Sequence, residues 1–418
     1  MVTRRFYKFD LLTITIIVLV GLIHLPYPFA GDQALFTLCA LKLHQGALLY
    51  KDFWDLKQPG IYGFYLLAGK LFGFDEVGVH LLELIYMLAF SVVLILGCRD
   101  YFRSRSLVSL VPLLTVGFYY GVAASHQLTQ LEVLVGFPIF LSLYCACQAV
   151  EPNQRGARFL FLSGFMGGVV LTFKLVLLPI PLSFWVTSLV IAAKRKKSGL
   201  ASELLRGCWP ILMGALLPLL VVLCLFASLH DVGPLLYTAF TYPLQVMTEL
   251  PKEDRIGTLL TGLQWFLGNF APLLALGFIG AWLSLVRCRD VMSVNLVLWV
   301  VVGVFVILLQ RYSWWDYHYL LVLVPLGILS AKGVEGAWER LPPGHIPARA
   351  WSERVFVLVA LLLLFSPVLD SWAMLGLRPP RVRTESRGAA AVPSQSQSRI
   401  CEGGQRCGFL VAARQSAG

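Results

Sequence analysis

The stretch that determines the architecture is residues 29–77, which read FAGDQALFTLCALKLHQGALLYKDFWDLKQPGIYGFYLLAGKLFGFDEV. It is too polar to cross a membrane and too apolar to be an ordinary solvated loop. Gly31 and Asp32 open a helical pattern that Gly46 can close, and a second apolar stretch follows Pro59. Glycine suits helix ends and proline suits a first helical turn, so the pattern predicts two helices.

These two helices are expected to lie along the outer membrane surface, joined by the polar turn 50–59. The second helix carries Tyr62, Tyr65 and Phe72, and aromatic side chains with a polar tip sit readily at the level of the lipid headgroups. Helices in that position hold a site at the boundary between headgroups and water.

The whole chain has the composition of a membrane protein. Of its 418 residues, 58% are hydrophobic and 14% are charged, and the mean hydropathy is +0.75. A soluble chain carries roughly 25% charged residues and roughly 45–50% apolar ones. The apolar residues also fall in blocks of about 15 to 20, the length needed to cross a hydrocarbon core of about 30 Å as helix. Secreted, cytosolic and nucleic-acid-binding classes are therefore excluded.

The predicted fold class is an all-α polytopic membrane protein with about 11 transmembrane helices. The net charge is +11, and most Lys and Arg residues fall in loops that lie inside if the N-terminus is cytoplasmic, so we expect that orientation. The predicted spans are residues 11–28, 78–97, 107–123, 131–150, 159–173, 175–193, 209–229, 259–285, 291–309, 318–333 and 355–372.

Residues 159–193 are divided into two crossings. At about 1.5 Å per residue, one helix of this length would be too long for the bilayer. Lys174 interrupts the run, and Pro179 follows closely. Two crossings also keep the basic block 194–197 on the inside.

The odd number of spans places the C-terminus outside. Residues 376–418 are rich in Pro, Ser, Gln and Gly and lack a hydrophobic period. This composition predicts a disordered tail without a folded outer domain. The expected organisation is a membrane-embedded core, residues 1–375, followed by this tail.

The first outer loop resembles that of the GT-C membrane glycosyltransferases. The resemblance rests on Gly-Asp32 followed by an aromatic residue, and on the pattern ALKLxxGxLLYKDFWDLKQPGxY. The resemblance covers the first 75 residues. Within the family, this loop is most similar to the protein O-mannosyltransferase and lipid A aminoarabinose transferase branch. The segments GGVVLTFK, which ends at Lys174, and QRYSWWDYHYLLVLVPLGILSAKG fit more loosely.

This resemblance implies an inverting transfer of a sugar from a polyprenyl phosphate to an acceptor lipid, glycan or protein on the outer face. The family's catalytic acid corresponds to Asp32, which would take the acceptor proton. Asp at the start of a helix is also a routine N-cap, so capping alone is the alternative. Glu132 is implied as a second acid that assists Asp32 or orients the acceptor, with chance placement left open.

The leaving phosphate has to meet fixed positive charge at the membrane surface. Lys57 falls in the family's Lys-Pro region, with Gln58 inserted before the proline, and the resemblance implies a contact with the donor phosphate. Lys174 and Arg311 are further outer-side cations that a phosphate would suit. The alternative for these cations is an ordinary side chain that snorkels to the lipid headgroups.

A sugar or acceptor pocket is expected beside these groups. In the alternative interpretation the turn residues only shape the turn, and His318 belongs to an aromatic belt. The residues assigned to the pocket are Tyr50, Asp52, Trp54, Asp55, His126 and His318.

No cofactor and no catalytic metal are expected, because Asp52-Phe-Trp-Asp55 is not a recognised ligand spacing and the cysteines form no cluster. The expected partners are the polyprenyl-phosphate sugar, membrane lipids and the acceptor, with no nucleic acid, in a bacterial plasma membrane. Two other classes are left open. One is a transporter or flippase, which usually places its ionisable groups at mid-bilayer. The other is an inactive accessory protein with a donor pocket.

Overall fold

The computed structural model describes residues 7–151, 156–196, 199–229, 231–249, 255–288, 290–310 and 315–338. These residues all belong to one compact unit, Met1–Leu369. Arg311, the predicted span 355–372 and the predicted tail 376–418 lie outside the described residues.

The described part of the chain is helical, as predicted, and its only pairing of extended backbone is an isolated bridge between Leu49 and Phe53. Within these residues nine helical segments are long and apolar enough to cross a membrane. They follow the nine predicted spans from 78–97 to 318–333 in order. The segments are Glu76–Gly97, Arg105–Val122, Leu131–Val150, Gly156–Phe173, Leu175–Arg195, Ala201–Ser228, Leu259–Val286, Val291–Leu309 and Asp316–Ala337.

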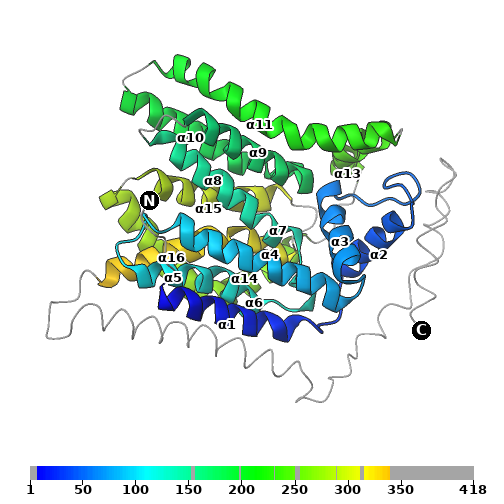
Figure 1. The fold of residues 1–418 in the computed structure, drawn as a ribbon, viewed down its shortest axis with the longest axis horizontal. Coiled ribbons are helices and arrows are strands. Elements are labelled where there is room, and N and C mark those ends of the chain that lie inside the picture. Colours follow the sequence, from blue (N-terminus) through cyan, green and yellow to red (C-terminus); the bar gives the residue numbers. More distant parts are fainter. Residues whose placement is uncertain are drawn as a thin grey trace. The chain divides into compact units, whose positions relative to one another are not determined.

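In the described residues the structure has sixteen α-helices, and Figure 1 shows how they are arranged. The helices that lie in the nine membrane-crossing segments are α4 (Glu76–Gly97), α5 (Arg105–Pro112), α6 (Phe118–Val122), α7 (Leu131–Leu134), α8 (Gly136–Val150), α9 (Gly156–Phe173), α10 (Pro179–Lys196), α11 (Leu200–Ser228), α14 (Arg255–Leu283), α15 (Val291–Leu309) and α16 (Leu323–Trp338). The others are α1 (Lys8–His24), α2 (Asp32–His44), α3 (Pro59–Phe72), α12 (Val232–Leu236) and α13 (Tyr242–Glu249). Short π and 3-10 segments join them: η1 (Leu113–Gly117), η2 (Ser125–Gln127), η3 (Leu175–Leu177), η4 (Tyr237–Thr241), η5 (Ser284–Cys288) and η6 (Asp316–Val322).

The first predicted span, 11–28, corresponds to a helix that begins and ends earlier than expected, at Lys8 and His24. α1 has 17 residues and ends at His24. Pro26 and Pro28 follow, and a proline both lacks the N–H a helix needs and disfavours helix in the residue before it. At 17 residues, α1 is at the short end of the range for a crossing helix, and the described residues do not confirm the predicted count of 11.

The chain breaks at Lys174, as the two-crossing prediction requires. α9 ends at Phe173, and Lys174 has extended backbone with φ −162°. α10 begins at Pro179, where the missing proline N–H costs no intrahelical bond. The polar side chain of Lys174 is thereby placed between two crossings rather than inside one.

α9 and α11 lie side by side in very close contact (Figure 1). A Cβ added at Gly164 would meet the backbone of Ile211, and one added at Gly168 would meet the backbone of Ala215. Helices in lipid gain little from hydrophobic association and rely on close van der Waals packing, which small residues allow. These two glycines therefore make the contact possible.

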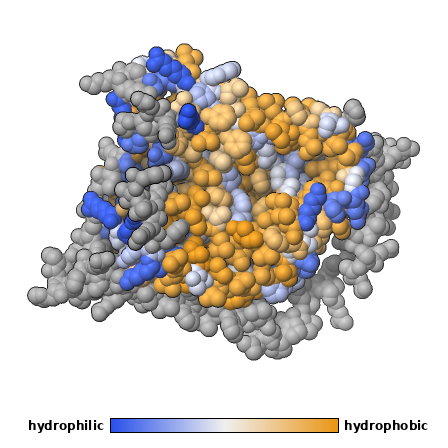
Figure 2. Space-filling view, in the orientation of Figure 1, coloured by the Kyte–Doolittle hydropathy of each residue, from blue (hydrophilic) through white to orange (hydrophobic). Residues whose placement is uncertain are grey.

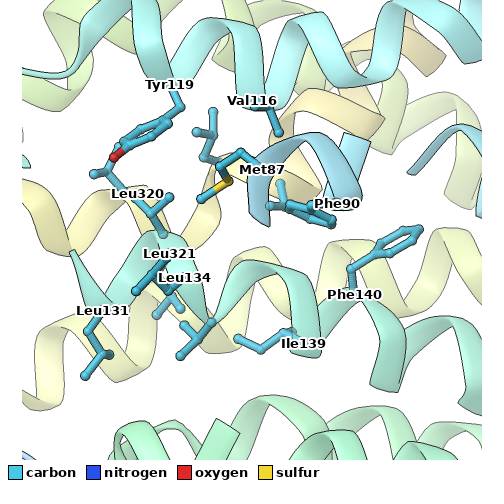
Figure 3. Packing of buried hydrophobic residues seen from close by; sticks show 14 of the residues in the cluster. Met87, Phe90, Val116, Tyr119, Leu131, Leu134, Ile139, Phe140, Leu320 and Leu321 are labelled. Atoms are coloured by element: carbon cyan, nitrogen blue, oxygen red, sulfur yellow. The ribbon is translucent and has the colours of Figure 1, made fainter. Parts of the chain in front are cut away.

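A core of apolar side chains fills the space between the crossings (Figure 3). Met87 and Phe90 of α4, Val116 of η1, Phe140 of α8 and Leu320 of η6 belong to this core, and all five are at most 2% exposed. On the face drawn in Figure 2, hydrophobic residues cover the middle, and hydrophilic residues gather toward the left and right ends. An apolar surface between two polar ends is what a bilayer requires of an integral membrane protein.

The two helices predicted for the first outer loop are confirmed as α2 and α3. They lie together at one end of the helical bundle in Figure 1. The ring of Phe36 on α2 meets Tyr62 and Tyr65 of α3 edge-on, with centroid distances of 5.9 and 5.5 Å. Such edge-on pairs fix one helix against the other, and the turn between them is brought beside α2. Their predicted position on the membrane surface stays a prediction.

Candidate active site

Asp32, the first residue of α2, lies where three distant segments meet. The N-cap position is taken by Gly31, whose φ of +62° favours glycine. Oδ2 of Asp32 lies 3.7 Å from Nζ of Lys57 and accepts a hydrogen bond from the Tyr317 hydroxyl at 3.2 Å. The Asp32 side chain is 32% exposed. Its carboxylate thus faces a cation and a hydroxyl group, and it remains accessible.

Glu132, Lys174 and His318 form a second, buried group. Nζ of Lys174 donates to Oε1 of Glu132 at 2.7 Å, and Nε2 of His318 lies 3.6 Å from the same oxygen. The side chains of Glu132 and His318 are 3% and 1% exposed. Ionised groups as buried as Glu132 and Lys174 are tolerated only with such close partners.

The two groups are electrostatically connected through Lys174. Burial lowers the pKa of Lys174, and the Glu132 carboxylate raises that pKa. Lys57 has a further lowering effect and Asp32 a further raising effect. The resulting pKa of Lys174 lies below its ordinary value. Charges influence one another strongly in a protein only when they are near. The predicted base, the predicted second acid and two of the three predicted cations therefore belong to one site.

A single turn of η6 contacts both groups. Tyr317 donates to Asp32, and the next residue, His318, lies against Glu132. The side chains of Tyr317 and His318 are almost completely buried. The relative position of the two carboxylates is thus fixed by two consecutive residues.

His126 stands at the exposed edge of the site. Its side chain is 44% exposed, and its Nε2 lies 2.9 Å from Oδ2 of Asp316. Gln127 donates to the same oxygen at 2.7 Å. A Cβ built on Gly31 would lie 4.0 Å from Cβ of His126. His126 is therefore beside the start of α2, where Asp32 begins the helix.

A cavity of about 350 Å³ opens next to the turn between α2 and α3. Two predicted pocket residues, Tyr50 and Trp54, line it; the other lining residues are Gly233, Pro234, Tyr237 and Thr238. Nε1 of Trp54 donates to Oγ1 of Thr238 at 2.9 Å. The hydroxyl of Tyr50 donates to the Lys57 carbonyl at 2.5 Å, so this wall of the cavity adjoins the main chain of Lys57.

The two aspartates predicted for the pocket are engaged within the turn. Asp52 accepts a hydrogen bond from the Leu48 amide at 2.7 Å. Asp55 is buried and accepts from the Leu56 amide at 2.7 Å and from the Tyr62 hydroxyl at 2.5 Å. Both carboxylates shape the turn in this arrangement, which is the alternative interpretation of these residues.

Sequence reasoning assigned no role to Tyr317 or Asp316. Both lie in the run WWDYHY that begins at residue 314. The available signal was a carboxylate and a hydroxyl group in an aromatic run at the start of a span, where an unpaired polar group is costly. Only the fold shows that this run reaches Asp32.

A buried carboxylate also shapes the segment that leads to Glu132. Glu83 of α4 is 1% exposed and accepts hydrogen bonds from the Tyr119 hydroxyl, the Thr129 amide and the Thr129 hydroxyl. Thr129 has φ +50°, which is rare for a β-branched residue. Glu83 therefore supports a strained residue next to Gln130, the N-cap of the helix that carries Glu132.

Solved structures share this architecture. No known protein family and no curated protein matches the sequence. The structure of ArnT from Cupriavidus metallidurans in the apo state matches with a TM-score of 0.57 and 16% identity, over 88% of this chain and 64% of that one. ArnT from the same organism bound to undecaprenyl phosphate matches with a TM-score of 0.60 and 17% identity, over 88% and 72%.

The archaeal oligosaccharyltransferase AglB from Archaeoglobus fulgidus, in complex with an inhibitory peptide and a dolichol-phosphate, also matches. The TM-score is 0.51 and the identity 12%, over 88% of this chain and 56% of AglB. The matched structures have the GT-C fold, so this chain has the GT-C fold that its outer loop predicts. The chain spans less than two thirds of the length of apo ArnT, 64%.

Proposed function

We propose that this protein is an inverting GT-C glycosyltransferase that moves a sugar from a polyprenyl phosphate to an acceptor on the outer face of the membrane. The observation that carries the proposal is the position of Asp32, 3.7 Å from Lys57 and in contact with Tyr317. An accessible carboxylate beside a fixed cation supplies the two groups that such a transfer needs. The GT-C fold supports the same proposal.

The proposed reaction has one displacement step. The acceptor hydroxyl attacks the anomeric carbon, and Asp32 takes the hydroxyl proton as general base. The bond between that carbon and the phosphate oxygen breaks, and its electron pair stays on the phosphate. Lys57 meets the charge that develops there. Attack opposite the leaving group inverts the anomeric centre.

This step requires the Asp32–Lys57 pair to separate. A base and a leaving group on opposite sides of one carbon cannot remain in direct contact, so the donor phosphate has to replace Asp32 as the partner of Lys57. The exchange costs little, because Lys57 keeps an anionic partner throughout. Asp32 is released from Lys57 by this exchange, so its carboxylate is free to accept a proton only when a donor is bound.

Lys174 is proposed as the second cation near the phosphate. It is paired with the buried Glu132, and the Lys57 charge affects its pKa. Glu132 keeps a positive charge in a place where burial alone would disfavour it. Glu132 thereby supports catalysis by maintaining Lys174, and it orients the acceptor only if a substrate reaches past that pair.

His126 and the cavity at Tyr50 and Trp54 are proposed to contact the sugar or the acceptor. His126 is exposed beside the start of α2, and the cavity adjoins the main chain of Lys57. Both therefore lie next to the position proposed for the reacting centre. His318 is buried against Glu132 and supports that residue instead.

The experiment is a transfer assay on the purified chain in lipid vesicles, with a panel of polyprenyl-phosphate sugars and simple acceptors. We expect one donor to be consumed, with release of polyprenyl phosphate and an inverted anomeric centre in the product. Transfer with retention would contradict the mechanism. Movement of intact lipid between leaflets without cleavage of the sugar would reject the enzyme in favour of a flippase.

A further inference from the structure

Tyr50 has a backbone conformation that its side chain disfavours. Its φ is +70°, in the left-handed region where a bulky residue is an outlier. The conformation is held by the Tyr50 amide, which donates to the Phe53 carbonyl at 2.7 Å. Strained residues of this kind persist when the surrounding structure requires them, and they gather at functional sites.

The strained conformation directs the Tyr50 hydroxyl to Lys57. The hydroxyl donates to the Lys57 carbonyl at 2.5 Å. The ring of Tyr50 is 6% exposed and stacks on Phe226 of α11 with a centroid distance of 5.8 Å. The main chain of Lys57 is thus tied to a membrane-crossing helix through one tyrosine.

A second tyrosine fixes the residue before Lys57. Tyr62 of α3 is completely buried, and its hydroxyl donates to Asp55 at 2.5 Å. The other oxygen of Asp55 accepts from the Leu56 amide at 2.7 Å. The ring of Tyr62 meets Phe36 of α2, the helix that begins with Asp32. This contact ties the turn to the helix that carries the proposed base.

Both hydroxyl groups remain donors over the whole physiological pH range. Burial raises the pKa of Tyr50 and of Tyr62, and the Asp55 carboxylate raises both further. A hydrogen bond from a hydroxyl to a carboxylate is stronger than one between neutral groups. The support of the turn is therefore permanent and does not switch with pH.

We propose that Tyr50 and Tyr62 are positioning residues for Lys57, and that their hydroxyls hold the main chain at 56–57 so that the ammonium stays where the donor phosphate can replace Asp32 as its partner. Lysine has a long flexible side chain and a compact charge, so its location depends on how firmly its backbone is fixed. A cation displaced by about 1 Å is a much poorer partner for a developing charge. The inference rests on the proposed function in that Lys57 is taken to meet the donor phosphate.

The test is a double-mutant cycle between the tyrosines and Lys57. We expect Tyr50→Phe and Tyr62→Phe each to lower kcat/KM about three- to tenfold, the size of one net hydrogen bond. In a Lys57→Ala background neither change should lower it further. Equal losses in both backgrounds would show that the tyrosines act on the structure in general and would overturn the proposal.

Tyr86→Phe is the matched control. The Tyr86 hydroxyl also donates to a backbone carbonyl, that of Leu134, at 2.7 Å. It does not contact the turn, so its removal should leave kcat/KM unchanged in both backgrounds. A loss as large as that of Tyr50→Phe would overturn the proposal, because it would show that any such hydroxyl has this effect.

A second measurement does not depend on activity. Lys57 has a side chain that is 15% exposed, and its modification by an amine-acylating reagent can be followed by mass spectrometry. We expect Lys57 to be modified at least about threefold faster in Tyr50→Phe and Tyr62→Phe than in wild type or Tyr86→Phe. Equal rates would overturn the proposal. Faster modification in a protein that transfers no sugar would reject the proposed function and leave the positioning role intact.

Discussion

Lys174 and Glu132 form an ion pair 2.7 Å apart at the break between α9 and α10, with side chains 13% and 3% exposed. The break is local and rests on one residue in extended backbone. The pair is near enough to Lys57 for the Lys57 charge to affect the pKa of Lys174. Its stability therefore affects both the fold and the proposed site.

Removal of one partner of this pair is expected to be costly. Glu132→Gln should lower the free energy of unfolding by about 3–5 kcal/mol, because the Lys174 charge is left buried without compensation. The joint change Glu132→Gln with Lys174→Met should recover most of the loss. The measurement is unfolding of the detergent-solubilised protein by denaturant. A single variant as stable as wild type would contradict the role of the pair.

An exposed ion pair provides the control. Arg195 and Glu151 lie 3.3 Å apart with side chains 47% and 52% exposed. Glu151→Gln should change the free energy of unfolding by less than about 1 kcal/mol, as is usual for solvated pairs. A loss there as large as in Glu132→Gln would show that burial is not the cause.

The pKa of Lys174 also predicts how stability changes with pH. Burial holds it below its ordinary value of 10.5, so between the folded pKa and that value the unfolded chain binds more protons than the folded one. Stability contributed at this position therefore rises with pH across that range. The thermal midpoint of wild type should increase relative to Lys174→Met as pH rises. A difference that stays constant or shrinks would contradict the assignment.

Lys57 should control donor binding. Lys57→Met is expected to weaken binding of a polyprenyl phosphate about 10- to 100-fold, the usual effect of removing a charged hydrogen-bond partner. Lys70→Met is the control, because Lys70 is an exposed lysine of the same helix pair. Binding is measured by calorimetry with the lipid in detergent. Equal affinities for both variants would exclude Lys57 as the phosphate partner.

The sequence predicts the helices well, because their ends are marked by residues with strong backbone preferences. Gly31, Gly46 and Pro59 delimit α2 and α3, and Lys174 with Pro179 marks the break between two crossings. The predicted first span, 11–28, extends past the end of α1, because it includes the two prolines that follow His24. Local preferences therefore carry most of the topology.

The contacts of the site follow from the sequence only in part. Asp32, Lys57 and Glu132 were identified through a resemblance to a family, not through physical reasoning about distance. The contact from Tyr317 depends on how a late span packs against the first outer loop, and no local pattern encodes that. For Asp55 the sequence left two roles open, lining the pocket or shaping the turn, and the hydrogen bonds that its carboxylate accepts lie within the first outer loop.

The central claim is that Asp32 removes the acceptor proton. It is tested most directly by the rate of sugar transfer in Asp32→Asn, with donor binding measured on the same sample. Asn keeps the shape of the side chain but cannot take the proton, so we expect a loss of about 100-fold or more in kcat with donor affinity nearly unchanged. Asp75→Asn is the control, since Asp75 caps α4 through the Gly78 amide and Asn caps equally well. Full transfer by Asp32→Asn would contradict the account.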